Sequence, residues 1–162
     1  MSNLQPARVL LARDLVLEGY RYSDLRQLAR TGELRHLRRG AYSRDETELS
    51  NESRHRQLIH ATLPLLRSGV VSHLSAAVMH DLPVPPGRLN LVQVTQPQAR
   101  SGQRRGHVHR YAAPLSSDEI TAVDGLPVTS LARTVVDLGR TLPFAHAVAT
   151  ADAAPTERAR AR

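Results

Sequence analysis

The sequence predicts an α+β protein of two parts, a small helical unit that ends in a basic hairpin and a mixed α+β domain. The 162 residues are 41% hydrophobic, which suffices for a packed core of mainly Leu, Val and Ala, since only 3% are aromatic. Helical spacing of apolar residues dominates the first half of the chain, whereas alternating segments appear after residue 88. A polar, acidic stretch at residues 43–53 predicts domains at residues 1–46 and 47–154, with a frayed tail at 155–162.

The first part is expected to contain two short helices and a hairpin. Apolar residues between 6 and 18 have the spacing of a largely buried helix that Gly19 ends. Ser23 is a suitable N-cap for a second helix, which has an apolar stripe at i, i+3 and i+4 starting from Leu25. Residues 38–40 (Arg-Arg-Gly) predict a tight turn, and a return strand follows it.

The second part is expected to combine helices and strands. A helix is predicted at residues 52–66, and a small-residue helix capped by Ser72 or Ser75 follows it. The Asp-Gly pair at 124–125, between two apolar runs, is a strong hairpin signal. The remaining expected elements are strands at 70–71, 89–95 and 107–112, a flexible basic loop at 100–106, hairpin strands at 120–123 and 126–128, and helices at 130–140 and 144–154.

Every basic residue of the chain is an arginine, and the formal net charge is +7 with a pI of about 11.1. This balance favours a polyanionic partner, either nucleic acid or an anionic membrane surface. Arginine binds phosphates and guanine edges through a planar fork, but codon bias in a GC-rich genome explains the absence of lysine equally well. The missing lysine excludes Schiff-base and P-loop chemistry, and the missing cysteine excludes disulfides, thiol catalysis and the usual zinc fingers.

Nothing in the sequence predicts membrane insertion or export. No window approaches about 18 consecutive apolar residues, and the N-terminal segment MSNLQPARVLLARD does not have the pattern of a signal peptide. We therefore expect a cytoplasmic protein that does not associate with a membrane.

Most of the excess positive charge lies between Gly19 and Arg44. This segment holds seven arginines and two acidic residues, a net charge of +5 (7 − 2). A short helix in the major groove of DNA, with a hairpin on the phosphate backbone, needs this distribution. Arginines of the helix would reach base edges, and those of the turn would meet phosphates. The alternative is a solvated helix and hairpin in which codon bias selected arginine.

A second basic cluster consists of Arg100, Arg104, Arg105 and Arg110, and residues 98–110 contain no acid. The cluster is a candidate contact for nucleic acid or for an acidic partner protein. The alternative, a mobile solvated loop, is the simpler interpretation and is favoured.

The eight histidines do not have the spacing of a metal site. The sequence has no HExxH helix, and packing or surface roles are expected for its histidines. His107 and His109 alternate on one predicted strand and could share a face, but no third ligand can be named. We therefore expect neither a metal site nor a cofactor.

A catalytic triad is not indicated either. Ser72-His73 lies near Asp81, but the chain has no GxSxG elbow, and neighbouring residues of one helix do not face each other. Asp137 lies four residues after Arg133 on a predicted helix, where an ion pair is the expected contact. We therefore expect no catalytic residues and no enzymatic activity.

Five segments in order resemble the AbiEi antitoxin family, and together they extend over most of residues 7–154. RTGELRHLRRGAY is similar to the end of the family's N-terminal winged helix, in which a G-x-L-x-x-x-x-x-G-x-Y run forms the wing. VVSHLSAAVMHDLPV is similar to a small-residue helix of actinobacterial members, and LNLVQVTQP to the strand that follows it. HVHRYAAPL and GLPVTSLARTVVDL also resemble family segments.

The resemblance implies a winged helix-turn-helix-like unit that binds double-stranded DNA at inverted repeats of its own promoter. It also implies that the α+β domain antagonises a toxin similar to nucleotidyltransferases, as in a type IV toxin–antitoxin system. The oligomeric state stays open. Carried over to this sequence, the DNA-contacting residues are Tyr22, Ser23, Arg26, Gln27 and Arg30 on the helix and Arg35, Arg38 and Arg39 at the wing.

Two features depart from the family pattern. Only one helix is predicted before the recognition helix, where a full winged helix usually has two, so the helix at 52–66 or a dimer would complete the fold. Longer relatives continue after ADAA into a domain resembling a very-short-patch-repair nuclease, so this chain is expected to be a short or truncated member. The alternative functions are a protein-interaction module that binds an acidic partner without DNA, and a truncated remnant of such a nuclease protein.

Overall fold

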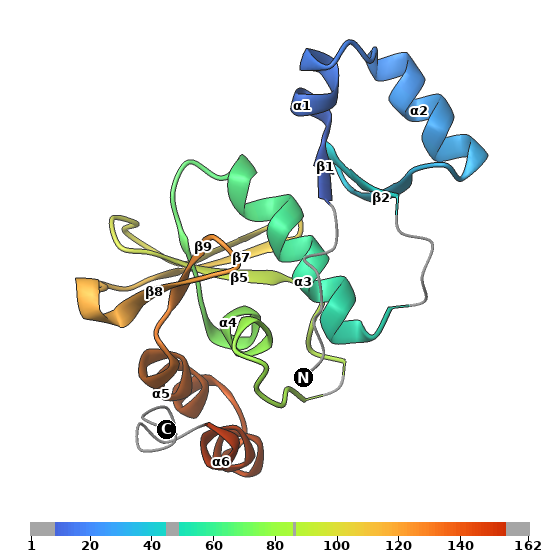
Figure 1. Cartoon of the computed structure of the whole chain (residues 1–162). Coiled ribbons are helices and arrows are strands. Elements are labelled where there is room, and N and C mark those ends of the chain that lie inside the picture. Colours follow the sequence, from blue (N-terminus) through green and yellow to red (C-terminus); the bar gives the residue numbers. More distant parts are fainter. Residues whose placement is uncertain (1–8, 45–48, 86, 155–162) are drawn as a thin grey trace, which may run out of the picture. The chain divides into compact units, whose positions relative to one another are not determined.

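The structure, a computed structural model, describes residues 9–44, 49–85 and 87–154, and it is α+β as the sequence predicts (Figure 1). The chain divides into two compact units, Met1–Arg67 and Ser68–Arg162. Each unit has its own β-sheet. The tail expected at 155–162 lies outside the described residues, as do residues 45–48 of the expected linker.

The first unit combines a three-stranded antiparallel sheet with three α-helices. Its elements in chain order are β1 (Val9–Leu11), α1 (Ala12–Leu17), α2 (Tyr22–Thr31), β2 (Arg35–Arg38), β3 (Ala41–Ser43), α3 (Asn51–Thr62) and the short 3-10 helix η1 (Leu63–Leu65). The strands lie in the order β1-β3-β2, so β3 pairs with both of the others.

The prediction of one N-terminal helix over residues 6–18 is wrong in its first half. Val9–Leu11 is strand β1, which pairs antiparallel with β3. Helix α1 begins only at Ala12, whose N–H donates to the carbonyl oxygen of Gly40 at 2.9 Å. A short run of consecutive apolar residues fits a buried strand as well as a helix, and the pairing with β3 decides between them. Residues 6–8 lie outside the described residues.

The N-cap of α2 is Arg21 rather than the expected Ser23. The Asp24 carboxylate accepts a hydrogen bond from the Arg21 N–H at 2.8 Å, so the cap comes from a residue in the first turn. At the other end, Gly32 has the left-handed φ of 85° that favours glycine after a helix. The predicted apolar stripe is confirmed, because Leu25 has no exposed surface. It packs in a core formed by Ala12, Leu15, Leu25, Leu34 and Tyr42.

Helix α3 belongs to the first compact unit, whereas the sequence predicts a second domain that starts at residue 47. Ala61 of α3 is fully buried in a cluster with residues of β1 and β3. Gln57 of α3 accepts a hydrogen bond from the guanidinium group of Arg35 on β2. Because these contacts join α3 to the sheet, the unit extends to Arg67.

The second unit is built on a six-stranded mixed sheet. Its elements in chain order are β4 (Val70–Val71), α4 (His73–Met79), β5 (Val92–Gln96), β6 (Gln103–Arg105), β7 (Val108–Ala112), the 3-10 helix η2 (Ser117–Glu119), β8 (Ile120–Val123), β9 (Leu126–Thr129), α5 (Leu131–Thr141) and α6 (Phe144–Ala153). The strand order is β6-β7-β5-β4-β9-β8, in which the β5–β7 and β4–β9 pairs are parallel.

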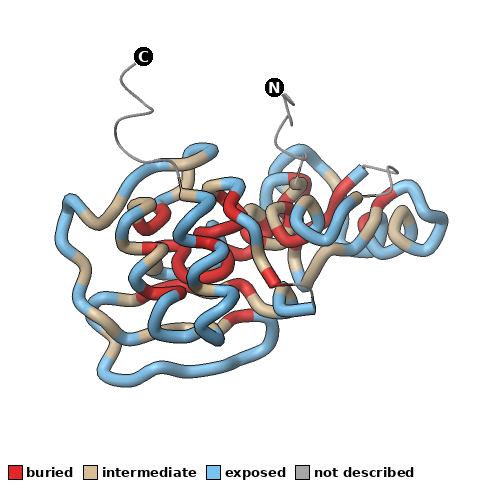
Figure 2. The backbone as a smooth tube through the Cα atoms, turned by 90° about the horizontal axis from the view of Figure 1, so that it is seen from below, coloured by how far each residue is buried: buried red, intermediate tan, exposed pale blue. Residues whose placement is uncertain are grey.

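Helix α4 is the central helix of the second unit. It packs against strands β5 and β9 and against α5, which in turn contacts α6. All of its residues are buried, and they lie among the segments drawn red in Figure 2. Its small side chains, predicted to allow close packing, permit these contacts.

Most elements of the second unit lie close to where the sequence predicts them. The β8–β9 hairpin turns at Asp124 and Gly125, both with positive φ (50° and 76°), as the Asp-Gly signal predicts. The prediction of a loop at 100–106 is partly wrong, because Gln103–Arg105 is an edge strand paired antiparallel with β7. All three residues of β6 are polar and exposed, so no apolar alternation indicated a strand.

Candidate nucleic-acid interface

Helix α2 has one apolar face and one polar face. Leu25 is buried, and Leu28 and Ala29 are half-buried against the same core. The helical period therefore turns the intervening residues to solvent. The helix residues expected to contact DNA are all exposed, namely Tyr22, Ser23, Arg26, Gln27 and Arg30.

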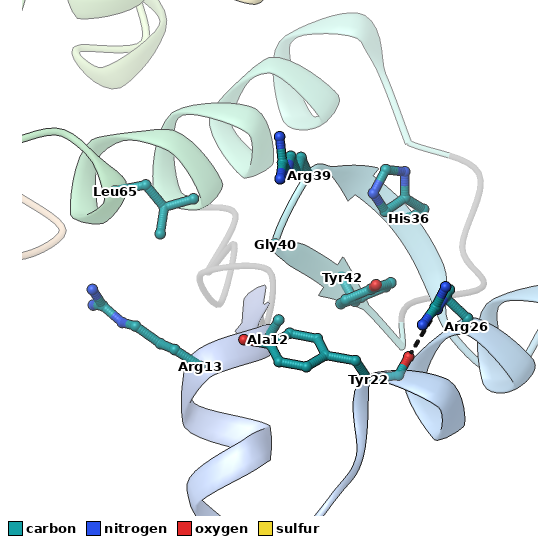
Figure 3. A pocket seen from close by; sticks show the side chains of 9 residues that line it. All are labelled: Ala12, Arg13, Tyr22, Arg26, His36, Arg39, Gly40, Tyr42 and Leu65. Atoms are coloured by element: carbon teal, nitrogen blue, oxygen red, sulfur yellow. Dashed lines mark hydrogen bonds between the residues drawn. The ribbon is translucent and has the colours of Figure 1, made fainter.

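Tyr22 and Arg26 begin this polar face one helical turn apart. The Tyr22 side chain is large and exposed, with 59% of the residue open to solvent. Nε of Arg26 donates a hydrogen bond to the Tyr22 carbonyl oxygen at 3.3 Å, drawn as the dashed line in Figure 3. This bond directs Arg26 toward the N-terminal end of the helix and leaves its two terminal amino groups for other partners.

Helices α1 and α2 and the β2–β3 hairpin surround an open hollow of about 760 Å³ (Figure 3). Arg13, Arg26 and Arg39 line it, and among the described residues no carboxylate does. Arg13 is engaged elsewhere, because its Nε lies 3.4 Å from the Asp14 carboxylate and its Nη1 donates to the Pro64 carbonyl at 3.3 Å. Arg26 and Arg39 are therefore the cations that the hollow offers to an anion. The remaining lining residues are Ala12, Tyr22, His36, Gly40, Tyr42 and Leu65.

The turn between β2 and β3 presents Arg39 to solvent. Gly40 has a φ of 82°, a left-handed conformation that favours glycine. The strand register also shifts between His36 and Arg38, so the hairpin is irregular just before the turn. The turn predicted from Arg-Arg-Gly is confirmed, and it places an exposed arginine next to the hollow.

The three arginines expected at the wing have different environments. Arg35 is half-buried, and its Nη2 donates to a side chain of α3. Arg38 is also half-buried. Arg39 is exposed and lines the hollow together with Tyr22 and Arg26. Tyr22, Arg26 and Arg39 therefore line the same hollow. The Arg35 guanidinium instead contacts α3.

Two aromatic residues of the hollow, His36 and Tyr42, are not among the site residues predicted from the sequence. Their ring centroids lie 5.4 Å apart with a tilt of 58°. His36 is exposed on β2, and Tyr42 is buried on β3. The predicted hairpin could have indicated them, because His36 and Tyr42 are register partners on its two strands.

The arginines of the second basic cluster do not all share one face of the sheet. Arg104 and Arg105 are consecutive residues of β6, so their side chains point to opposite faces of the sheet. Arg104 is in register with His109 of β7, whereas Arg110 alternates to the other face. Arg100 is exposed and precedes β6.

The predicted ion pair between Arg133 and Asp137 is confirmed. Nε of Arg133 lies 2.9 Å from Oδ1 of Asp137, and its Nη1 lies 2.9 Å from Oε1 of Glu119. The backbone N–H of Ser116, and then the Arg133 side chain, hold the pKa of Glu119 below its ordinary value. These contacts connect α5 to η2, the segment before β8.

Ser72-His73 does not form a catalytic triad in the structure. Oγ of Ser72 lies 3.0 Å from Nδ1 of His73, and Oδ2 of Asp137 approaches the same nitrogen at 4.0 Å. In a triad, the serine and the carboxylate face opposite ring nitrogens. His73 is instead a buried ring stacked on Tyr111, with centroids 3.6 Å apart. Burial lowers its pKa to about 4, although Asp137 acts in the opposite direction.

Acidification from neutral pH to about pH 4 is expected to destabilise the second unit through His73. The folded state keeps the imidazole neutral down to about pH 4, whereas the unfolded chain protonates it near 6.5. Its contribution to stability is therefore complete above pH 6.5 and is lost as the pH falls to 4, a change of about 3 kcal/mol. His73→Asn removes this dependence, because the Asn amide does not titrate in this range. Asn is a suitable replacement since it tolerates the left-handed φ of 52° at this position.

Urea unfolding followed by circular dichroism at several pH values measures this difference. His146→Asn serves as the control, because it makes the same replacement at an exposed position of α6. An equally steep loss of stability in wild type and His73→Asn would show that another group causes it.

Within the described ranges, no group of three or more His, Cys, Asp or Glu side chains is placed to hold a metal ion. In the same part of the chain, no helix combines the length and apolar character needed to cross a membrane. A comparison with protein-family models gives no match, and a comparison with curated proteins gives no significant match.

Proposed function

We propose that this protein is a DNA-binding transcriptional regulator whose first unit acts as a winged helix-turn-helix-like DNA-binding unit. The observation that carries the proposal is that Arg26 of α2 and Arg39 of the β2–β3 turn line one hollow, in which the described residues place no carboxylate. The exposed polar face of α2 lies beside them. The order of two helices and a hairpin fits this class of fold, and α3, packed on the sheet, supplies a third helix.

In this proposal, α2 enters the major groove of double-stranded DNA. Its ten residues extend over about 15 Å, and the groove, about 12 Å wide, admits one helix. Arg26, Gln27 and Arg30 face base edges, where arginine and glutamine forks recognise guanine and adenine. Arg39 and the Tyr22 hydroxyl bind phosphates and fix the position of the helix.

Arg39→Ala is expected to weaken binding to every duplex to a similar extent and to reduce the salt dependence of binding. A phosphate contact releases condensed counterions, so its loss lowers the slope of log K against log salt by about 0.9. Fluorescence anisotropy of a labelled duplex from the region upstream of the gene, at several salt concentrations, measures both effects.

Arg140→Ala is the matched control for this experiment. Arg140 is an exposed arginine in the last turn of α5, so its replacement removes the same charge from the second unit. The control is expected to keep the wild-type slope. If Arg39→Ala keeps the wild-type slope of log K against log salt, or if Arg140→Ala decreases the slope equally, the turn does not contact DNA.

We further infer that the second unit is an antitoxin domain that binds a partner protein. The ordered segments similar to AbiEi antitoxins support this role. A specific observation also favours it, because Phe144 is 84% exposed and Val148, one turn later on α6, is 38% exposed. Exposed apolar side chains on one helix face favour a protein partner. The regulator then represses its own promoter at inverted repeats and antagonises a nucleotidyltransferase-like toxin in the cytoplasm, without being an enzyme.

Phe144→Ser is expected to abolish co-purification with the toxin encoded beside the gene while leaving DNA binding unchanged. The change removes a large apolar contact that the fold itself does not bury. Affinity co-purification of the two proteins, next to the anisotropy assay, measures both properties. Unchanged co-purification would place the partner elsewhere. Partner binding without any DNA binding would favour the protein-interaction module.

A further inference from the structure

A small pocket in the second unit is lined by cations and neutral hydrogen-bond donors. It has a volume of about 250 Å³ and lies among the segment before β5, the sheet and the end of α5. In the part of the chain that the structure describes, no carboxylate lines it. The Thr141 hydroxyl at its wall already donates to the Asp137 carbonyl. The other polar lining residues, named here the anion pocket, are Arg88, Asn90, Gln93, Arg104, His109 and Tyr111.

The sheet register brings three side chains of the anion pocket into one row. Gln93 of β5 is in register with His109 of β7, which is in register with Arg104 of β6. Register partners share one face of a sheet. Tyr111 follows His109 on the same face, and the two ring centroids lie 4.1 Å apart. Of the two neighbouring arginines of β6, Arg104 lies in this row, whereas Arg105 points to the opposite face of the sheet.

Nδ2 of Asn90 donates a long hydrogen bond of 3.5 Å to the Gly87 carbonyl oxygen, whereas the other side-chain donors of the anion pocket make none among the described residues. Oε1 of Gln93 accepts the Leu74 N–H at 2.8 Å, which leaves its Nε2 group as a donor. Among the described residues, the side chains of Arg88, Arg104 and His109 make no hydrogen bond or ion pair. Burial, and then the charge of Arg104, hold the pKa of His109 below its ordinary value. The pocket therefore holds positive charge that none of its described lining residues balances.

We infer that the anion pocket binds the phosphate group of a small phosphomonoester. Two guanidinium groups match a phosphate bidentately, and its three terminal oxygens accept the additional amide, imidazole and phenol donors. The volume of the pocket is below the usual range for drug-sized ligands, which suits a small phosphomonoester. This inference does not depend on DNA binding by the first unit.

Isothermal titration of the full chain with inorganic phosphate, and with a nucleoside monophosphate, tests the inference. Saturable one-to-one binding is expected, and Arg104→Ala is expected to weaken it by at least about tenfold. Arg105→Ala is the matched control, because it removes the adjacent exposed arginine from the other face and should leave the affinity unchanged. Arg104 is itself exposed, so an unchanged melting temperature without ligand is expected for its variant.

Arg88→Ala, a change in the segment before β5, is a second variant that is expected to weaken binding. Tighter binding of the nucleoside monophosphate than of phosphate would support the inference and identify an organic group as part of the ligand, whereas equal binding would support it with free phosphate as the ligand. Three results would overturn it: no saturable binding at millimolar concentrations, equal weakening by Arg104→Ala and Arg105→Ala, or acetate binding as tight as phosphate.

Discussion

Arg26→Ala is expected to reduce the affinity for the upstream duplex by about 1–3 kcal/mol while changing the affinity for an unrelated duplex much less. Arg26 lies on the exposed face of α2, and among the described residues it makes one hydrogen bond, from its Nε to the Tyr22 carbonyl oxygen. Its two terminal amino groups can therefore meet the acceptors of a guanine edge. Competition between labelled upstream duplex and unlabelled upstream or scrambled duplex, at one salt concentration, measures the discrimination.

Arg26→Lys separates charge from geometry at the same position. Lysine keeps the positive charge but lacks the planar fork, so this variant is expected to retain affinity for the unrelated duplex and to lose much of the discrimination. A proportional loss on both duplexes in Arg26→Ala would assign Arg26 to the phosphate backbone. No loss on either duplex would exclude it from the interface.

Leu25→Ala is expected to lower the free energy of unfolding of the first unit by about 2–5 kcal/mol, because it opens a cavity in a closed core. Leu25 has no exposed surface and anchors the apolar face of α2. Urea unfolding followed by tyrosine fluorescence measures the change, since three of the four tyrosines lie in the first unit, at positions 20, 22 and 42. DNA binding is expected to fall with it, although Leu25 contacts no DNA.

Leu17→Ala is the control for the core substitution. It removes the same atoms from the same unit, but Leu17 is 87% exposed on α1, so a change within about 0.5 kcal/mol is expected. Similar unfolding curves for Leu25→Ala and Leu17→Ala would contradict the packing of α2 described above.

Features with a local cause could be predicted from the sequence. The stripe that begins at Leu25 predicted which face of α2 is buried and, by the same period, that Arg26, Gln27 and Arg30 are exposed. The Asp-Gly pair at 124–125 predicted the β8–β9 hairpin, because these residues accept the positive φ of its turn.

Features with a distant cause could not be predicted. Strand β1 exists because β3 pairs with it, and its apolar residues alone fit a helix equally well. The orientation of Arg35 depends on Gln57, which lies 22 residues later on α3. Arg104 and His109 meet through the antiparallel register of β6 and β7, and β6 has no apolar pattern that would indicate a strand.

The central claim is that the first unit binds double-stranded DNA through α2 and the β2–β3 turn. Its most direct test is the affinity of the full chain for its own upstream duplex at moderate salt, measured for wild type, the double variant Arg26→Ala/Arg39→Ala, and Arg140→Ala. We predict saturable binding by wild type and Arg140→Ala, and binding weaker by about a hundredfold in the double variant. Equal binding by wild type and the double variant, or no binding by either, would contradict the claim.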